Sequence, residues 1–149
     1  MNSLEYAAKI AEPFEGFVSD PYHDPVGYPT RGYGELLSLE KWADLKQWKS
    51  VTREEAHQNL MNHMLKDLSA IRRLISVSLS EAQEGSLIDF AYNLGTGALQ
   101  SSTLRRRLNQ GIYEDVPAQL MRWNKAGGRI LRGLTRRREA EASLWVSGS

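Results

Sequence analysis

The segment from residue 14 to residue 35, FEGFVSDPYHDPVGYPTRGYGE, decides which kind of fold this chain can adopt. Its aromatic and apolar residues are interleaved with prolines and glycines, and this mixture predicts short strands joined by turns. We therefore expect a small β-hairpin or meander over residues 17–38. Because so short a β segment does not form a sheet domain by itself, the remainder of the chain must supply the core.

Helix-start signals lie on both sides of this segment. Asn2 and Glu5 form a capping-box pair that opens a first helix, which we expect Gly16 to end and Pro13 to bend or shorten. Further capping residues precede apolar-periodic runs at Thr52, Ser80, Ser102 or Thr103, Asp115 and Thr135, and the expected stops are Gly95, Gly111 and Gly127-Gly128.

The run after Ser80 is apolar on most sides, so we expect it to form the buried central helix. The predicted architecture is α+β, with a small N-terminal β subregion at about residues 14–50 beside a larger helical body at about residues 51–146. A length of 149 residues agrees with a single domain.

Composition narrows the possible functions. Hydrophobic residues make up 41% and charged residues 25% of the chain, which is typical of a soluble globular protein. The absence of cysteine excludes a disulfide scaffold and a cysteine nucleophile, and only three histidines argue against a metal centre, so we expect no metal and no cofactor. No apolar run approaches the roughly 20 residues of a membrane span, and the N-terminus lacks the pattern of a secretory signal. We expect a monomer without stable membrane insertion.

The charge is unevenly distributed along the chain. Residues 101–149 contain 10 Lys and Arg against 4 Asp and Glu, although the net charge of the whole chain is only +1. This basic third suggests an anionic partner such as nucleic acid, a membrane or an acidic polysaccharide. Solvated helix faces explain the same composition equally well.

Two carboxylates and one hydroxyl stand out in the β segment. Glu15 lies at the expected C-terminal end of the first helix, where the helix dipole and the flanking Phe14 and Phe17 favour the protonated carboxyl that a general acid needs. Asp24 lies in a polar turn region, which favours its ionised form. One protonated and one ionised carboxyl suit glycosidic bond hydrolysis, and the Thr30 hydroxyl is placed to orient a water. Taken alone, however, the Glu-x8-Asp spacing is common, and a surface Glu with a turn-forming Asp remains an alternative.

The wider pattern resembles that of the phage-type lysozymes (endolysins, the T4-lysozyme-like muramidases of glycoside hydrolase family 24). In that family the spacing Glu-x8-Asp-x5-Thr defines a catalytic triad, and Glu15, Asp24 and Thr30 match it. The resemblance covers roughly residues 10–146, and its later motifs follow in order: residues 90–95 (FAYNLG), 102–104 (STL), 122–124 (RWN), 126–128 (AGG) and 133–141 (GLTRRREAE). It implies a lysozyme-like fold with an active-site cleft between the β subregion and the helical body.

The resemblance also implies roles. Glu15 is expected to be the general acid, with Asp24 and Thr30 positioning the attacking water for an inverting hydrolysis; a separation of roughly 6.5–9.5 Å between the two carboxyl groups would agree. The implied substrate is the β-1,4 bond between N-acetylmuramic acid and N-acetylglucosamine in peptidoglycan. The expected sugar contacts are Tyr92, Asn93, Arg122 and Trp123, with core packing as the alternative for Tyr92 and for Trp123. Arg136 or Arg137 is expected to reach toward Glu15, because the family motif carries such a contact.

This chain departs from the family at two positions. The family usually has TIGYGH where this chain has TRGYGE at residues 30–35, so Arg31 replaces an apolar residue and Glu35 a histidine. Glu35 adds a third carboxylate near the site, where it either pairs with Arg31 or alters substrate preference or pH optimum. Residues 42–48 (WADLKQW) are interpreted as a structural loop in preference to a flap or a membrane- or glycan-facing patch, and His23 as a solvated turn residue.

The leading hypothesis is a muramidase that lyses a bacterial host. Without an export signal, we expect it to stay in the host cytoplasm until a holin releases it to the periplasm and the cell wall, with a thin Gram-negative wall as the target. The alternatives are a lysozyme-like domain repurposed to bind wall glycan or a protein, a lytic transglycosylase, and a nucleic-acid binder. The last rests on the basic third alone, so we expect no nucleic-acid partner.

Overall fold

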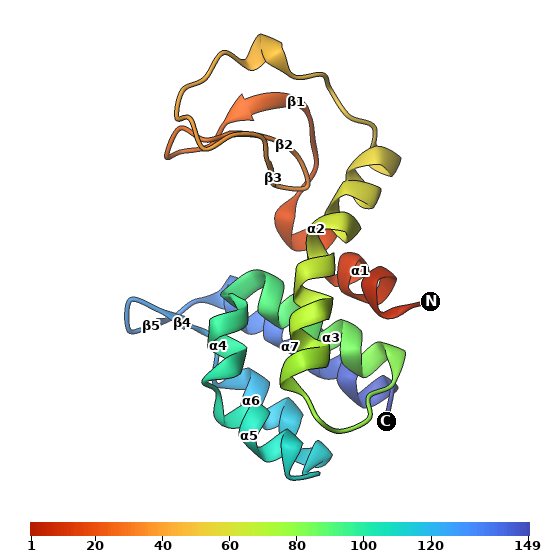
Figure 1. Cartoon of the computed structure of the whole chain (residues 1–149). Helices are drawn as coiled ribbons and strands as arrows, with labels where there is room; N and C mark the ends of the chain where they lie inside the picture. Colours follow the sequence, from red (N-terminus) through yellow and green to blue (C-terminus); the bar gives the residue numbers. More distant parts are fainter. The chain divides into compact units, whose positions relative to one another are not determined.

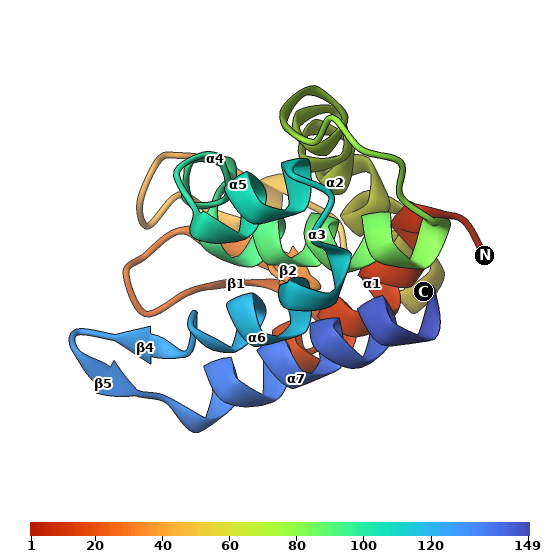
Figure 2. The ribbon, with the colours of Figure 1, turned by 90° about the horizontal axis from the view of Figure 1, so that it is seen from below.

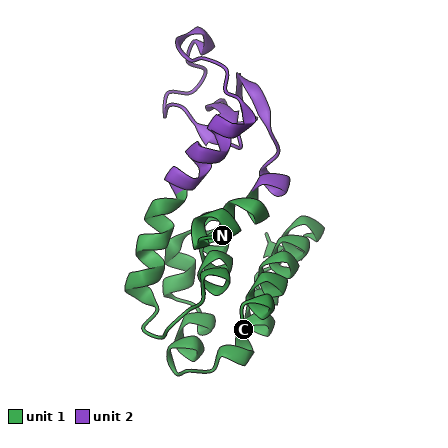
Figure 3. Ribbon diagram, turned by 90° about the vertical axis from the view of Figure 1, so that its right-hand side faces the viewer, with its two compact units in different colours: residues 1–11, 64–149 green, residues 12–63 purple.

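In the computed structural model all 149 residues are described, and the chain divides into two compact units (Figure 3). One unit consists of residues 12–63, and the other consists of residues 1–11 together with residues 64–149. Helices α1 (Ser3–Glu15) and α2 (Arg53–Leu74) contribute residues to both units. Small antiparallel sheets accompany a mainly helical chain, which confirms the α+β class.

The unit of residues 12–63 contains a three-stranded antiparallel sheet in the order β1-β2-β3 (Figure 1). Its elements are β1 (Val18–His23), β2 (Pro29–Gly32), β3 (Glu35–Leu36) and a 3-10 helix, η1 (Leu45–Gln47). The predicted meander is thus confirmed. Thr30 lies in the central strand, opposite Tyr22 of β1 and Leu36 of β3, so the backbone at Thr30 is held from both sides.

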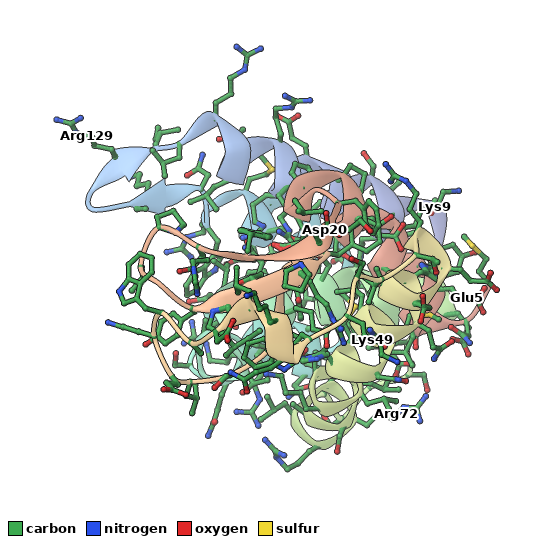
Figure 4. The ribbon with its side chains drawn as sticks, turned by 90° about the horizontal axis from the view of Figure 1, so that it is seen from above. Glu5, Lys9, Asp20, Lys49, Arg72 and Arg129 are labelled. Atoms are coloured by element: carbon green, nitrogen blue, oxygen red, sulfur yellow. The ribbon has the colours of Figure 1, made fainter.

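The sheet packs closely on the beginning of α2. Gly32 of β2 is so near that a Cβ atom there would lie 3.1 Å from the Cβ of Ala56. The Ser50 hydroxyl, in the segment that precedes α2, donates a hydrogen bond to Asp20 of β1, which is labelled in Figure 4. These contacts give the small sheet the core that its own length cannot supply.

The structure confirms the predicted capping boxes of Thr52 with Glu55 and of Ser80 with Gln83; at Asn2 it shows one of the two bonds, from the Glu5 N–H to the Asn2 side chain. Helix α1 ends at Glu15, and the following Gly16 has a φ of 73°, a conformation that favours glycine. Pro13 lies inside α1 without ending it. No helix combines the length and the apolar character needed to cross a bilayer.

Helix α3 (Glu81–Leu94) forms the centre of the other unit, and nine of its 14 residues are buried. This confirms the predicted central helix. Helix α7 (Arg132–Ser147) packs against both α3 and α6 (Val116–Met121), and the three helices run close together in Figure 2. The shorter elements of this unit are α4 (Thr96–Gln100), α5 (Thr103–Asn109) and η2 (Tyr113–Asp115).

Two predicted helix caps are wrong. Asp115 stands at the start of α6, but its carboxylate binds Arg107 and Gln119 instead of the helix backbone. Thr135 lies within α7, which begins three residues earlier, at Arg132. In both cases a side-chain or backbone partner competes for a residue that commonly caps helices.

The prediction that Gly127-Gly128 ends α6 is wrong, because this helix already ends at Met121; the two glycines instead form the turn of an unpredicted hairpin. Strands β4 (Lys125–Ala126) and β5 (Arg129–Ile130) pair on either side of it, and both glycines have positive φ, at 58° and 78°. Such values suit a tight hairpin turn. The Arg129 side chain extends from this hairpin into solvent (Figure 4).

Candidate active site

Glu15 is the last residue of α1, and the turn at Gly16 leads directly into β1. Its side chain is partly exposed. Gly34, between β2 and β3, lies near this carboxyl, since a Cβ atom there would lie 4.0 Å from Oε2 of Glu15. Gly34 has a φ of 75°, so the left-handed conformation that glycine tolerates shapes the backbone beside this carboxyl.

Asp24 lies in the turn between β1 and β2. Its Oδ1 accepts hydrogen bonds from the backbone N–H groups of Val26, Gly27 and Tyr28, at 2.9, 2.8 and 2.9 Å. The Asp24 N–H in turn donates to the Tyr28 carbonyl at 2.9 Å. One carboxylate oxygen therefore organises the turn, which leaves Oδ2 for a water or a substrate. Asp24 is partly exposed, so solvent reaches it.

Thr30 is buried in the central strand, with 7% of its surface exposed. Its hydroxyl donates to the Tyr28 carbonyl at 2.9 Å. Because the hydroxyl proton is used in this bond, Oγ1 of Thr30 can take part in further hydrogen bonds only as an acceptor. Asp24 and Thr30 thus share Tyr28 as a backbone partner, which links their positions.

Aromatic side chains support this end of the unit. The Phe17 and Tyr33 rings lie 5.4 Å apart between centroids, and the Arg53 guanidinium lies 4.5 Å from the Phe17 centroid. Phe14 is 37% exposed. The role of Phe14 and Phe17 in withdrawing Glu15 from water stays a prediction.

Glu35 forms the pair with Arg31 that was one of its two predicted roles, with Nε and Oε1 3.1 Å apart. Asn59 of α2 donates to the same oxygen at 3.1 Å, and Arg31 also donates to the Lys49 carbonyl at 2.7 Å. The two departures from the family motif therefore compensate each other in charge. Their effect on specificity stays a prediction.

His23 is not the solvated turn residue that the sequence predicts. It ends β1, is partly buried, and its Nε2 lies 2.7 Å from the Ala43 carbonyl. Its ring also lies 5.2 Å from the Trp42 ring between centroids. His23 thus links the segment after β3 to β1. No group of three or more His, Cys, Asp or Glu side chains is arranged to hold a metal ion.

The remaining predicted residues belong to the helical unit. Tyr92 and Asn93 lie near the end of α3, and the Asn93 side-chain oxygen accepts from Arg138 at 2.7 Å. Arg122 is exposed and donates to Gln119 at 3.2 Å. Trp123 contacts Phe90 edge-to-face, with the ring centroids 5.5 Å apart, so it contributes to packing in this unit.

The two candidate arginines of α7 differ sharply. Arg136 is exposed, whereas Arg137 is buried and binds Asp89 through both Nε and Nη2, at 3.0 and 2.8 Å. Arg138, which the sequence reasoning did not select, is fully buried and pairs with Glu141 at 2.9 Å. The spacing of Arg138 and Glu141 along the helix was a visible signal of a pair, but their burial was not.

Burial perturbs two carboxyls in this unit. Withdrawal from water raises the pKa of Asp67 to about 6, with a smaller contribution from the nearby charge of Asp89 and an opposing one from Lys66. Burial also raises the pKa of Glu141 well above its usual value, and a hydrogen bond with Asp89 acts in the same direction. These groups lie in the core around α3, where the sequence analysis proposed no chemistry.

The fold resembles that of solved lysozymes. An endolysin from Escherichia coli O157:H7 phage FAHEc1 aligns with a TM-score of 0.82 at 28% identity, covering 100% of this chain and 96% of that one. The muramidase domain of SpmX from Asticaccaulis excentricus aligns with a TM-score of 0.79 at 27% identity, covering 94% of each chain. The α+β architecture is therefore lysozyme-like.

Sequence comparison identifies the family. The model described as Phage lysozyme matches residues 12–141, so the chain belongs to the phage lysozyme family. The endolysin of Bacillus phage B103 is 32% identical over 99% of this chain, and the SAR-endolysin of Bacteriophage PS119 is 35% identical over 90% of this chain and 77% of its own length. The chain spans about half the length of the Bacillus phage endolysins that it matches, 55% for phage B103 and 45% for phage PZA.

Proposed function

We propose that this protein is a muramidase that hydrolyses the β-1,4 bond between N-acetylmuramic acid and N-acetylglucosamine in bacterial peptidoglycan. The observation that carries the proposal is the shared backbone partner of Asp24 and Thr30, Tyr28, in a chain of the phage lysozyme family. This arrangement ties a carboxylate and a hydroxyl acceptor to the same backbone residue of the turn between β1 and β2. Glu15 enters the same unit from the end of α1.

In this mechanism Glu15 is the general acid. Its proton passes to the glycosidic oxygen as the bond to the sugar carbon breaks, so the leaving sugar departs as an alcohol. The partly exposed Glu15 carboxyl is accessible to a substrate. After the reaction Glu15 is ionised and regains a proton from solvent.

Asp24 and Thr30 position the nucleophile. A water donates one hydrogen bond to Oδ2 of Asp24 and the other to Oγ1 of Thr30, whose own proton is held by the Tyr28 carbonyl. The water oxygen attacks the sugar carbon and Asp24 accepts the proton that the water loses. Attack from the face opposite the leaving group inverts the configuration, so a β bond yields an α product.

We also infer sugar-contacting roles for Tyr92, Asn93, Arg122 and Trp123 in the helical unit, and for Glu35 near the triad. Of the two candidate arginines, Arg137 is the better placed to act on a carboxyl, because Asp89 holds its guanidinium in a fixed orientation. The spacing of Glu15, Asp24 and Thr30 supports our proposal that the chain belongs to glycoside hydrolase family 24. Its SAR-endolysin relatives favour a branch of that family other than the T4-like one.

The decisive experiment compares Glu15→Gln with the unchanged protein in clearing permeabilised cells and in releasing reducing sugar. We expect activity to fall roughly a thousandfold, the contribution typical of a general acid, while the fold survives. Glu12→Gln is the matched control, since Glu12 lies on the same helix and its carboxylate binds His57. The proposal is overturned if Glu15→Gln clears cells as fast as the unchanged protein. It is also overturned if the unchanged protein binds the wall without releasing reducing sugar, or if its products carry anhydro ends.

For release, we propose that a holin gives the protein access to the wall from the host cytoplasm. Several relatives are named SAR-endolysins, and a route without a holin is the competing possibility. Expression with and without a co-expressed holin separates the two, with lysis timed by culture turbidity. Lysis that requires the holin supports our proposal, and lysis that proceeds equally without it contradicts it.

A further inference from the structure

Trp42 has a combination of features that the triad does not explain. It is the only non-glycine residue of the chain with a positive φ, at 60°, and it is nevertheless 64% exposed. The left-handed conformation costs a side-chain-bearing residue roughly 1–2 kcal/mol, and burial of this indole does not repay that cost. Such strain persists only where the surrounding contacts impose it.

The contacts that impose it come from the turn that holds Asp24. The Trp42 N–H donates to the Gly27 carbonyl at 2.7 Å. The indole lies so close to Gly27 that a Cβ there would be 2.6 Å from Cε2 and 2.8 Å from Nε1 of Trp42. Only glycine leaves room for the ring. The Gly27 N–H, for its part, donates to Asp24 at 2.8 Å, so one glycine contacts both residues.

The residues directly before and after Trp42 also contact the β1–β2 region and so hold this segment in place. The Lys41 ammonium lies 5.4 Å from the centroid of the Tyr28 ring, and the Ala43 carbonyl binds His23. The His23 ring is tilted by 60° against the indole. The Trp42 ring is therefore an exposed aromatic surface whose position is fixed by the contacts of residues 41–43. Its indole N–H has no hydrogen-bond partner within the chain. The prediction that residues 42–48 form a packed structural loop fails at this residue.

We propose that Trp42 is a glycan-stacking subsite, on which one N-acetylhexosamine ring of the peptidoglycan strand lies beyond the sugars bound at Asp24. This inference rests on the proposed function. A flat aromatic face suits the C–H face of a sugar ring, and the indole N–H is available to a hydroxyl or acetamido oxygen. A rigid platform costs little conformational entropy when it binds.

The charges around Trp42 favour a neutral glycan over a lipid surface. Residues 36–48 contain two acidic and two basic side chains, Glu40, Asp44, Lys41 and Lys46. Attraction to an anionic membrane requires an excess of basic residues close to the inserted side chain. This segment has none.

The test uses the Glu15→Gln protein, so that glycans bind without being cleaved. The probes are soluble peptide-free strands of alternating N-acetylglucosamine and N-acetylmuramic acid, six sugars or longer, and the corresponding disaccharide. We expect Trp42→Ala to weaken long-strand binding about tenfold, the effect of about 1.4 kcal/mol, and to leave disaccharide binding unchanged. Trp42→Phe, which keeps a flat ring, restores most of the affinity. Leu39→Ala is the matched control, because Leu39 is 81% exposed in the same segment but has no ring.

A second measurement covers the case in which Trp42→Ala disturbs the fold. In the Glu15→Gln protein, the indole N–H resonance of Trp42 shifts when long strands are added and stays in place with the disaccharide. Equal long-strand affinity of Trp42→Ala, or an unmoved Trp42 resonance, overturns the inference while leaving the triad intact. Failure of the Glu15→Gln protein to bind any glycan overturns the proposed function instead. Loss of binding to anionic phospholipid vesicles alone would assign Trp42 to a membrane and also overturn the inference.

Discussion

The two compact units use polar residues in opposite ways. In residues 12–63, the Asp24 carboxylate and the Thr30 hydroxyl form hydrogen bonds with backbone groups of one turn. Asp24 is also partly exposed to solvent, and the Thr30 oxygen keeps lone pairs that can accept a further hydrogen bond. In the helical unit, Asp89 and Arg137 bury their charges against each other. Substitutions in the sheet unit are therefore expected to change activity with little loss of stability, and substitutions of the buried charges are expected to change stability.

The largest effect is expected from Asp24→Asn in the sheet unit. The amide oxygen of asparagine can still accept the three N–H groups that shape the turn, but it cannot take a proton from water. We expect wall-clearing activity to fall roughly a hundredfold to a thousandfold with a melting temperature within about 2 °C of the unchanged protein. Asp20→Asn, on the adjacent strand, should keep its activity. A large drop in melting temperature with Asp24→Asn would break the contrast between the units.

The counterpart in the helical unit is Asp89→Asn. It leaves the Arg137 guanidinium buried with one fewer counter-charge, and breaking a buried ion pair typically costs about 3–5 kcal/mol. Thermal unfolding followed by circular dichroism should show a drop of roughly 10 °C. Asp115→Asn, at the partly exposed pair with Arg107, should cost less than about 1 kcal/mol. Equal losses for the two variants would show that burial is not the cause.

Asp67→Asn sharpens the comparison through pH. Because burial raises the Asp67 pKa from 3.8 to about 6 on folding, the folded protein binds this proton more tightly than the unfolded chain. Stability from this group is present below about pH 4 and is lost as the pH rises toward 6. We expect Asp67→Asn to stabilise the protein by roughly 2–3 kcal/mol at pH 8, with little effect at pH 4. A stability gain that is the same at both pH values would contradict the assignment.

The smallest effect is expected at the Arg31–Glu35 pair, which is partly buried within the sheet unit, with 19% and 18% of the two side chains exposed. A double-mutant cycle with Arg31→Met and Glu35→Gln, read from urea unfolding, should give a coupling energy of about 0.5–1 kcal/mol. A coupling above about 2 kcal/mol would mean that the sheet unit, too, depends on a buried ion pair. The contrast between polar residues that serve activity and buried charges that serve stability would then not coincide with the division into two units.

Local signals made much of this fold predictable. The reciprocal bonds at Thr52 and Ser80 involve residues three positions apart, so the sequence alone indicates where α2 and α3 begin. The β meander likewise follows from prolines and glycines within one short segment. The hairpin at Gly127-Gly128 was missed because its strands have only two residues each, too few to show alternation.

The contacts that determine the roles of other residues are distant along the chain. Arg137 and Asp89 are 48 residues apart, and the pattern of α7 does not distinguish the buried Arg137 from the exposed Arg136. Asp67 is buried close enough to Asp89 of α3, 22 residues away, for the two charges to interact, and no local window reveals that proximity. The backbone conformation of Trp42 depends on Gly27, and the sequence between them carries no sign of that contact.

The close contact of Gly27 with Trp42 has an evolutionary consequence. A side chain at position 27 would occupy the space of the indole, so Trp42 can change while Gly27 stays, but Gly27 cannot change while the indole keeps its place. Lineages that replace the glycine must also replace the tryptophan with a smaller residue, and thereby give up the aromatic platform. We therefore expect relatives that lack Gly27 to lack Trp42 as well, and to bind long glycan strands without this stacking subsite.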